Sequence, residues 1–397
     1  MLSGAGQETE NRSKTMWARL KATIVDFIQQ ADLVLLGLCC LAGGYGLVLI
    51  YSASHRLSSN LRLVAVQGVA ILLGVVCYIF FSTVDIEEAA KKWKWILGFN
   101  VLLMCCLVPF GVDSYGNRAW IQFPGFPVTV GPAEIVKITF AVLLSKQLAW
   151  LREERHDLKS IRAVGFLAAH LGLIAGLYYV LSSDMGNTLM FLLIFVAVTF
   201  VAGVALRWFI IGGGAAVAAF WAAWHFDFMP SHIRERFMVL LDHSYDPQGV
   251  GWQQTRSIVA LGSGQITGQG LLNGTQTQSG SLPFAWTDFI FSACGEELGM
   301  IGCLAVLLLL GAIIARCLLV ARRAKTPMST YVCVGLASML IFQTVENVGM
   351  CLFVLPVIGL TLPFFSYGGS SMVMLFCAMG IISGIKKRSR PDWLRDR

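Results

Sequence analysis

The chain has 397 residues, of which 56% are hydrophobic and only 13% are charged, with a net charge of +7 at pH 7. Apolar runs of about 18 or more residues recur along it, each long enough to cross a bilayer as a helix. This composition excludes a soluble globular protein, and we predict an all-α polytopic membrane protein. The positive charge indicates contact with membrane lipids and the orientation of the spans, with no nucleic-acid binding.

The apolar runs and their polar flanks predict about ten transmembrane helices. Most Lys and Arg residues then lie in segments on one side of the membrane, and the positive-inside rule assigns that side to the cytoplasm. Because the number of spans is even, both termini are expected in the cytoplasm. The helix centres are expected near Leu41, Leu72, Leu102, Ala141, Leu171, Phe195, Val217, Leu307, Gly335 and Gly380.

We expect one membrane-embedded domain, since the spans leave little chain for a separate soluble one. Residues 1–31 are predicted to be a cytoplasmic segment, 32–386 the ten-helix domain, and 387–397 a basic cytoplasmic tail. The first apolar run is too long for a signal-peptide core, so no cleaved signal is predicted. Residues 16–28 carry apolar side chains at helical spacing, which suits a short surface helix or an extension of the first span.

The eleven cysteines all lie in or at the ends of apolar spans, without a Cys-x-x-Cys arrangement. We predict buried free thiols rather than a disulfide framework or a metal site. The six histidines are scattered without ligand spacing, so a histidine-ligated metal is not expected.

The outer segment between the seventh and eighth spans, about residues 229–290, is far longer than an ordinary helix connection. Within it, residues 233–241 and 252–261 carry apolar side chains at helical spacing, which predicts helices at the membrane surface. Residues 262–281 are rich in Gly, Ser, Thr and Gln and suit a turn around a ligand. The segment ends at Asp288, whose carboxylate either caps the next helix or acts as a catalytic base.

Other charged residues lie inside or beside the spans. Glu134 and Lys137 are three residues apart on one helix face, so they can pair where an isolated charge costs at least about 2.5 kcal/mol. Asp184 lies near the outer end of the fifth span without an obvious local partner. Each of these residues is either structural or functional. Further candidates are Glu296, Glu297 and Glu346 on later spans, and Arg118 and Trp120 in the outer loop after the third span.

A loop rich in Pro, Gly and Ser, residues 362–371, lies between the last two spans. Hydrocarbon cannot satisfy its unpaired backbone groups, so we predict that the loop is buried in protein or hydrated.

Eight short motifs can be read in order along the chain. They are Arg118-Ala119-Trp120-Ile121, Pro132-Ala133-Glu134-Ile135-Val136-Lys137, Ser183-Asp184-Met185-Gly186, Gly262-Ser263-Gly264, Gly274-Thr275-Gln276, Thr287-Asp288-Phe289-Ile290-Phe291, Glu296-Glu297-Leu298-Gly299 and residues 362–370. Together they resemble the SEDS family, the shape, elongation, division and sporulation proteins such as RodA and FtsW. The Gly-Ser-Gly and Gly-Thr-Gln elements resemble the RodA branch more closely.

The resemblance implies a peptidoglycan glycosyltransferase that polymerises lipid II on the outer face of the bacterial cytoplasmic membrane. It places the family's essential aspartate at Asp288, which would deprotonate the 4-hydroxyl of the acceptor GlcNAc. That oxygen would attack C1 of the donor MurNAc and release undecaprenyl pyrophosphate. Candidates to stabilise this anionic leaving group are Arg118, Lys137 and Arg256, with or without a divalent cation. The resemblance also suggests Trp120, Glu134, Asp184, Thr287, Ser366 and Gly368 as residues that bind substrate or support the site.

The chain departs from the family pattern in the catalytic loop. Phe284 and Trp286 stand where family members commonly have Glu and His, so a neighbouring histidine that tunes Asp288 is not expected. Ala119 likewise precedes Trp120 where an arginine is usual.

The resemblance implies three kinds of partner: lipid II, the nascent glycan strand and a class B penicillin-binding protein. Two other functions stay open from the sequence. A flippase of lipid-linked precursor would use buried charges and a broken helix as a path. A non-enzymatic scaffold for a transpeptidase would tolerate the loss of Asp288.

Overall fold

The structure is a computed structural model that describes residues 31–389, except 115–116, 123–128, 243–248 and 250. The helix suggested at residues 16–28 lies outside the described residues. The elements in chain order are α2 (Leu33–Ala53), α3 (Asn60–Thr83), α4 (Ile86–Lys91), α5 (Trp93–Cys105), α6 (Leu107–Phe110), β1 (Gly111–Ser114), β2 (Asn117–Ile121), α7 (Pro132–Glu153), α8 (Ile161–Leu171), the π-helix η1 (Gly172–Gly176), α9 (Leu177–Ser182), α10 (Met185–Ala202), α11 (Leu206–His225), α12 (Ser231–Leu241), α13 (Trp252–Gly264), α14 (Thr275–Ser279), α15 (Ile290–Arg323), α16 (Pro327–Cys351) and α17 (Gly369–Ser389).

The all-α polytopic fold is confirmed, and each of the ten expected helix centres falls inside a helix. In the described part of the chain, nine helical segments are long and apolar enough to cross a membrane. The tenth is α7, which carries Glu134, Lys137 and Lys146 within its length. Its charges are tolerated because α7 is largely buried between other helices, so few of its side chains can face lipid.

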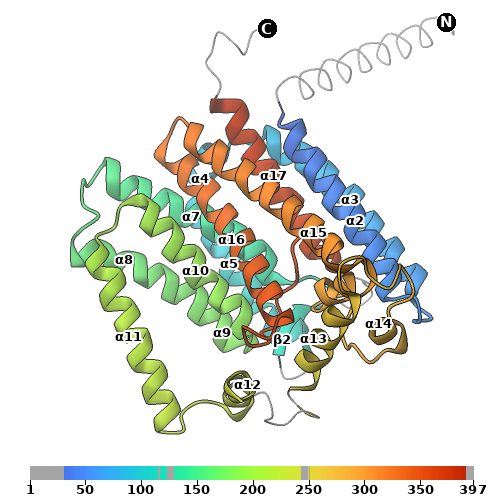
Figure 1. Cartoon of the computed structure of the whole chain (residues 1–397). Helices are drawn as coiled ribbons and strands as arrows, with labels where there is room; N and C mark the ends of the chain where they lie inside the picture. Colours follow the sequence, from blue (N-terminus) through green and yellow to red (C-terminus); the bar gives the residue numbers. More distant parts are fainter. Residues whose placement is uncertain (1–30, 115–116, 123–128, 243–248, 250, 390–397) are drawn as a thin grey trace, which may run out of the picture.

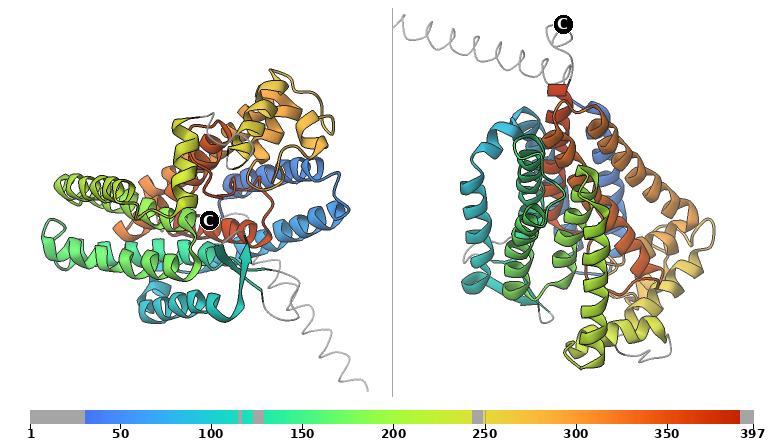
Figure 2. Two further views of the ribbon diagram at one scale, coloured as in Figure 1. Left: turned by 90° about the horizontal axis from the view of Figure 1, so that it is seen from below. Right: turned by 90° about the vertical axis from the view of Figure 1, so that its left-hand side faces the viewer.

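The helices run side by side, with the beginning of α2 and the end of α17 at one end of the bundle (Figure 1). At the opposite end lie α12, α13, α14 and β2 (Figure 1), and the right-hand view of Figure 2 shows the same end from the side. The sequence did not predict the antiparallel hairpin β1–β2, in which Val112 pairs with Trp120. Helices α12 and α13 confirm the two predicted helices of the long outer segment.

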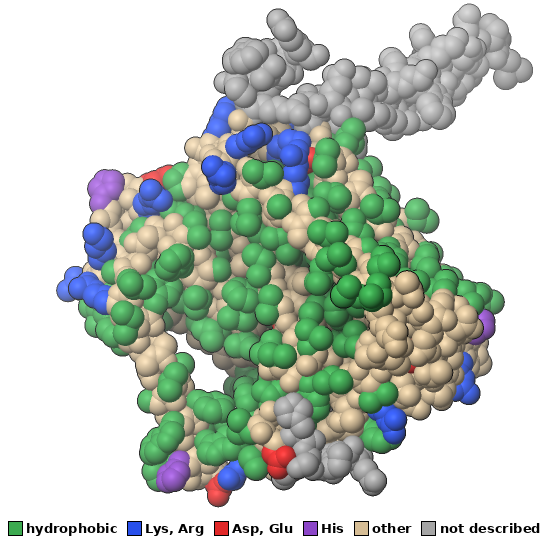
Figure 3. All heavy atoms as spheres, viewed as in Figure 1, with side chains coloured by type: hydrophobic (Ala, Val, Ile, Leu, Met, Phe, Trp, Pro, Cys, Tyr) green, Lys and Arg blue, Asp and Glu red, His purple; other side chains and the backbone are tan. Residues whose placement is uncertain are grey.

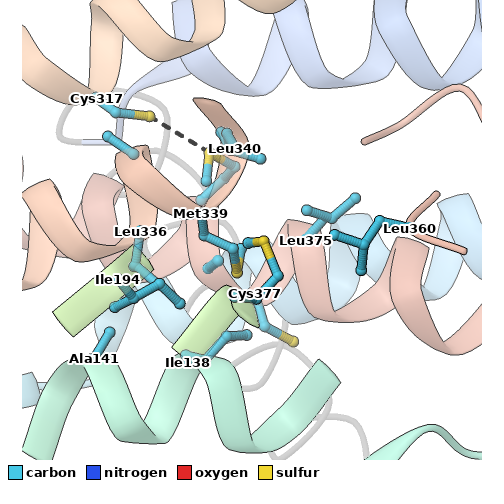
Figure 4. Close-up of a cluster of buried hydrophobic side chains, with 14 of the residues drawn as sticks. Ile138, Ala141, Ile194, Cys317, Leu336, Met339, Leu340, Leu360, Leu375 and Cys377 are labelled. Atoms are coloured by element: carbon cyan, nitrogen blue, oxygen red, sulfur yellow. Dashed lines mark hydrogen bonds between the residues drawn. The ribbon is translucent and has the colours of Figure 1, made fainter. Parts of the chain in front are cut away.

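The core forms where α7, α10 and α16 meet. Figure 4 shows Ile138 and Ala141 of α7 beside Ile194 of α10 and Leu336 of α16. The helices approach closely at Gly335, where an added Cβ would lie 3.1 Å from both Ala141 Cβ and Val198 Cγ2. Small residues at such contacts let membrane helices pack backbone to backbone.

An ionic cluster ties four helices together at the end where α2 begins. The buried Asp32 carboxylate accepts from Arg316 Nε at 2.8 Å and contacts Lys386 Nζ at 3.0 Å, while its carbonyl accepts from the Tyr78 hydroxyl at 2.8 Å. Burial raises the pKa of Asp32, but hydrogen bonds from Arg316 and Lys386 outweigh it and hold the pKa below its ordinary value. The cluster joins α2, α3, α15 and α17.

Hydrophobic side chains cover much of the face that Figure 3 shows, whereas Lys and Arg gather at the end where α17 finishes. Helix α11 stands apart from the bundle, and none of its residues is buried. All eleven cysteines are free, as predicted, but the prediction that they are buried is wrong for Cys105, which is exposed, and holds only in part for Cys40, Cys77 and Cys106.

Candidate active site

Asp288 lies at the end of the long outer segment, just before α15. Helix α15 begins at Ile290 with Phe289 at its N-cap position, and no side chain caps it. Asp288 is therefore not the helix cap that was one of its two interpretations. Its backbone carbonyl accepts from Asn347 Nδ2 at 2.8 Å, which fixes the residue against α16.

The loop between α16 and α17 holds the segment around Asp288 in place. Ser366 Oγ donates to the Thr287 carbonyl at 2.6 Å, and the Tyr367 N–H donates to the Trp286 carbonyl at 2.9 Å. Leu362, Phe364, Phe365 and Ser366 are buried, so the loop is enclosed by protein as its composition predicts.

Gln67, on α3, fastens the same loop from the other side. Its Oε1 accepts from the Gly368 N–H at 3.1 Å, and its Nε2 donates to the Ser366 carbonyl at 3.3 Å. The predicted residues Thr287, Ser366 and Gly368 thus lie on one hydrogen-bonded framework. Ser366 and Gly368 hold the framework through the Ser366 hydroxyl and the Gly368 N–H, whereas the Thr287 side chain also acts on the Asp288 carboxylate.

Burial makes the Asp288 carboxylate more basic than an ordinary aspartate. Desolvation raises its pKa to about 6, although Thr287 and the positive charge of Arg236 each lower it. The carboxylate is half-buried, so it keeps some contact with solvent. At neutral pH it is mostly ionised and still able to accept a proton from a positioned hydroxyl.

Arg236, on α12, is the cation beside Asp288, and the sequence did not predict it. It is half-buried, its charge acts on both Asp184 and Asp288, and its Nη1 donates to the Val357 carbonyl at 2.7 Å. This last bond ties α12 to the loop that precedes residue 362. A signal existed in the sequence, since Arg236 is one of few basic residues in a predicted outer segment.

Asp184 has local partners, contrary to the expectation that it has none. It is the N-cap of α10 and accepts from the Asn187 N–H at 3.1 Å and from Asn187 Nδ2 at 2.8 Å. The Tyr178 hydroxyl also donates to it at 3.1 Å. An aspartate three residues before an asparagine at a helix start is a capping pattern, which could have revealed this role.

Glu134 and Lys137 form the predicted ion pair, with 2.9 Å between Lys137 Nζ and Glu134 Oε1. The Lys137 side chain is fully buried, and Ser371 Oγ donates to Glu134 Oε2 at 3.3 Å. Trp120 packs over Gly131 next to Glu134, since an added Cβ at Gly131 would lie 3.2 Å from the Trp120 ring and 3.5 Å from Glu134 Cγ.

Tyr178 connects this ion pair with the group around Asp288. Its hydroxyl donates to Asp184, and the same hydroxyl lies within electrostatic reach of Glu134. Arg236 in turn interacts with both Asp184 and Asp288. The structure therefore brings most of the predicted site residues into one connected region.

Arg118 and Arg256 lie outside this connected region. Arg118 is exposed on β2. Arg256 stacks on Trp252, 3.9 Å from the ring centre, and its Nη1 lies 3.5 Å from Gln276 Oε1. Across the described residues, no hydrogen bond or ion pair joins either arginine to Asp288.

The two glutamates at the start of α15 shape the outer segment. Glu296 is fully buried and accepts from the N–H groups of Gln276 at 2.6 Å and Thr277 at 2.8 Å, and from the Thr277 hydroxyl at 2.7 Å. Glu297 accepts from Gln278 Nε2 at 2.8 Å and from Ser52. Their lone pairs are used by protein, so both have a structural role.

The sequence left undecided whether a divalent cation assists the reaction. Among the residues that the structure describes, no three His, Cys, Asp or Glu side chains lie close enough together to hold a metal ion.

Comparison with known proteins shows to which family the whole chain is related. The FtsW, RodA and SpoVE family model, described as a cell cycle protein, matches residues 32–391. The chain is 32% identical to a probable peptidoglycan glycosyltransferase FtsW of Haemophilus influenzae, covering 87% of each chain. It is also 32% identical to the peptidoglycan glycosyltransferase MrdB of Escherichia coli K12, covering 86% of this chain and 89% of that one. These equal identities leave the closer likeness to RodA a prediction.

A solved structure supports the fold over the same length. It is titled "Structural coordination of polymerization and crosslinking by a peptidoglycan synthase complex", and its matching chain has a TM-score of 0.76 and 28% identity. The match covers 91% of this chain and 99% of that one.

Proposed function

This chain belongs to the FtsW, RodA and SpoVE family of cell cycle proteins, and we propose on that basis that it is a peptidoglycan glycosyltransferase of the cytoplasmic membrane. It polymerises lipid II into glycan strands. The observation that carries the proposal is Asp288, a half-buried carboxylate with a pKa of about 6 beside Arg236. A carboxylate of this kind suits the removal of a proton from a sugar hydroxyl.

The site faces the outer side of the membrane in this proposal, and both termini are cytoplasmic. Support comes from the charges: Lys386, Lys387 and Arg388 end α17, and Arg322 and Arg323 end α15. The positive-inside rule assigns basic ends to the cytoplasm. Asp288 lies just before the start of α15, which is the other end of that helix.

In the proposed reaction, Asp288 takes the proton of the 4-hydroxyl on the acceptor's terminal GlcNAc. The oxygen attacks C1 of the donor MurNAc as the bond to undecaprenyl pyrophosphate breaks, and the diphosphate leaves with the bonding electron pair. Asp288 then releases its proton to water. Because the carboxylate is more basic than an ordinary aspartate and still ionised at pH 7, it suits this step.

Positive charge near the diphosphate lowers the barrier to its departure. We add Arg236 to Arg118, Lys137 and Arg256 as candidates, since Arg236 is the cation that acts on Asp288. Trp120, Glu134, Asp184, Thr287, Ser366 and Gly368 support the site in this proposal. Lys137 acts as a pair with Glu134, so its effect on the leaving group depends on that partner.

The proposed protein partner is a class B penicillin-binding protein with a single membrane helix. A solved relative belongs to a complex whose title joins polymerisation and crosslinking, and it covers nearly the same length as this chain.

The proposal is tested by incubating purified lipid II with the full-length chain and its cognate penicillin-binding protein, and measuring glycan strands by gel. Strands are expected only when this chain is present, and a transpeptidase inhibitor should leave their length distribution unchanged. If the complex forms but no strands appear, the chain is a scaffold. If lipid II instead crosses vesicle membranes that contain the chain, it is a flippase.

Arg236→Gln is expected to move the acidic limb of the pH–rate profile upward by about 0.5 to 1 pH unit. The neutral amide no longer stabilises the ionised carboxylate, so the pKa of Asp288 rises above about 6. Arg234→Gln is the matched control, because Arg234 pairs with the exposed Asp227 instead. An acidic limb that stays in place in Arg236→Gln would remove Arg236 from the site.

A further inference from the structure

Helix α16 carries a buried acid that the proposed mechanism does not use. Glu346 is 8% exposed, and no side chain among the described residues donates a hydrogen bond to its carboxyl oxygens, on which only the backbone N–H of Ile358 acts as a donor. Buried polar side chains are nearly always hydrogen-bonded, and a buried charge without a partner is more costly still. Such a group therefore requires a physical explanation.

Glu346 lies next to the segment that carries Asp288. The following residue, Asn347, donates from Nδ2 to the carbonyls of both Asp288 and Leu360 at 2.8 Å. An added Cβ at Gly359 would lie 4.0 Å from Asp288 Oδ2, so the loop after α16 also borders the carboxylate. The charge of Asp288 is close enough to act on Glu346.

Asp288 and Glu346 differ in the charged groups that surround them. Arg236, from α12, attracts the Asp288 carboxylate, and Asp184 at the start of α10 attracts the same guanidinium. On its own helix Glu346 faces Cys351, a thiol without positive charge. Within the described part of the chain, no Lys, Arg or His pairs with Glu346. Only Asp288 therefore has a counter-charge.

Two carboxyl groups that share a water-poor region do not both ionise readily, because each charge disfavours the other. One of them keeps its proton. Burial without a counter-charge assigns that proton to Glu346, and the neighbouring arginine assigns the single negative charge to Asp288.

We propose that Glu346 is a positioning residue that stays protonated beside Asp288, an inference that rests on the proposed function. The neutral acid keeps one carboxylate charge in the site, which is the charge of the base. When the pH rises and Glu346 gives its proton to water, a second negative charge competes for Arg236 and repels the diphosphate leaving group. Polymerisation then falls at alkaline pH.

The test compares pH–rate profiles of lipid II polymerisation for the wild-type complex and Glu346→Gln. The wild type should show an acidic limb near pH 6 and a separate alkaline limb. In Glu346→Gln the alkaline limb should vanish or move up by at least about one pH unit, while the rate at the optimum stays within about threefold. Glu346→Met, which leaves no polar atom to satisfy, repeats the test if the glutamine variant folds poorly.

Glu87→Gln is the matched control. Glu87 accepts from Ser329 Oγ at 2.6 Å and from Thr326, so it lies at the opposite end of α16 from Glu346. Its variant should keep both limbs of the profile. Unchanged limbs in Glu346→Gln would overturn the proposal, and so would a folded Glu346→Gln complex that is inactive at every pH.

A second readout does not need activity. If Glu346 is protonated when folded and ionised when unfolded, folding takes up a proton, and stability falls as the pH rises above about 4.3, where an ordinary glutamate ionises. The wild-type Tm should then fall with pH more steeply than that of Glu346→Gln, by about 2 to 4 °C per pH unit. Equal slopes would overturn the proposal. An inactive wild type with unequal slopes would instead count against the proposed function alone.

Discussion

Asp288→Asn is expected to reduce glycan polymerisation by at least about 100-fold, because a positioned general base contributes about 10² to 10⁴ in rate. Asparagine keeps the shape of the side chain but cannot accept the proton of the acceptor hydroxyl. The fixed position of the residue should survive, since Asn347 binds its backbone carbonyl and not its side chain. The measurement is the initial rate of strand formation from lipid II at pH 7 by the complex with its penicillin-binding protein.

The same substitution is expected to stabilise the fold at neutral pH. The pKa of Asp288 is about 6 when folded, above its value of about 3.9 when unfolded, so the folded chain holds this proton more tightly. The contribution of the group to stability is full below pH 4 and is lost as the pH rises to about 6. Removing the charge should therefore raise the free energy of unfolding at pH 7 by about 2 kcal/mol, after allowance for partial exposure.

The control for both effects is Asp227→Asn, in the turn just before the same outer segment. The Asp227 side chain is 76% exposed and pairs with Arg234. Its loss should change the rate by less than about twofold and leave stability nearly unchanged, since surface ion pairs contribute about 0 to 1 kcal/mol. If a folded Asp288→Asn complex keeps more than a tenth of the wild-type rate, Asp288 is not the catalytic base and its role is structural.

The transmembrane helices were predictable because hydropathy belongs to each segment by itself. The runs around Leu72 and Val217 signal a span whatever surrounds them. Helix α7 needed a second argument, since its charges are acceptable only if Glu134 and Lys137 pair on one face. The hairpin β1–β2 and the π-helix η1 were missed, because strands of four and five residues and a five-residue Gly-Leu-Ile-Ala-Gly turn have no pattern distinct from a loop or an ordinary helix.

The site was only partly predictable. Asp288 was identified as the base by resemblance, whereas its spacing alone favoured a helix cap. Arg236 was missed because it is one of two arginines on an amphipathic segment, and only packing of α12 against the loop at Val357 brings it to Asp288. Gln67 and Asn347 were missed for another reason. An uncharged amide in an apolar run looks ordinary, and the carbonyls and N–H groups that these two bind lie far away in sequence.

Lys137→Met is expected to lower the free energy of unfolding by about 3 to 5 kcal/mol, because it leaves Glu134 charged and without its cation in the membrane. The Lys137 side chain is fully buried and that of Glu134 is 13% exposed, so water cannot replace the lost partner. The measurement is thermal or denaturant unfolding of the purified protein in detergent. Lys146→Met is the control on the same helix, since Lys146 donates to the Ala90 carbonyl and forms no ion pair with an acid in the described part of the chain.

The double variant Lys137→Met with Glu134→Gln separates the two roles of the pair. It leaves no isolated charge, so stability should return to within about 1 kcal/mol of wild type, as replacing a whole buried ion pair often costs little. Polymerisation should stay at least about tenfold below wild type, because the positive charge proposed to act on the diphosphate is still absent. If activity returned together with stability, Glu134 and Lys137 would serve only to let α7 occupy the centre of the bundle, and the charge that assists the leaving group would have to come from Arg236.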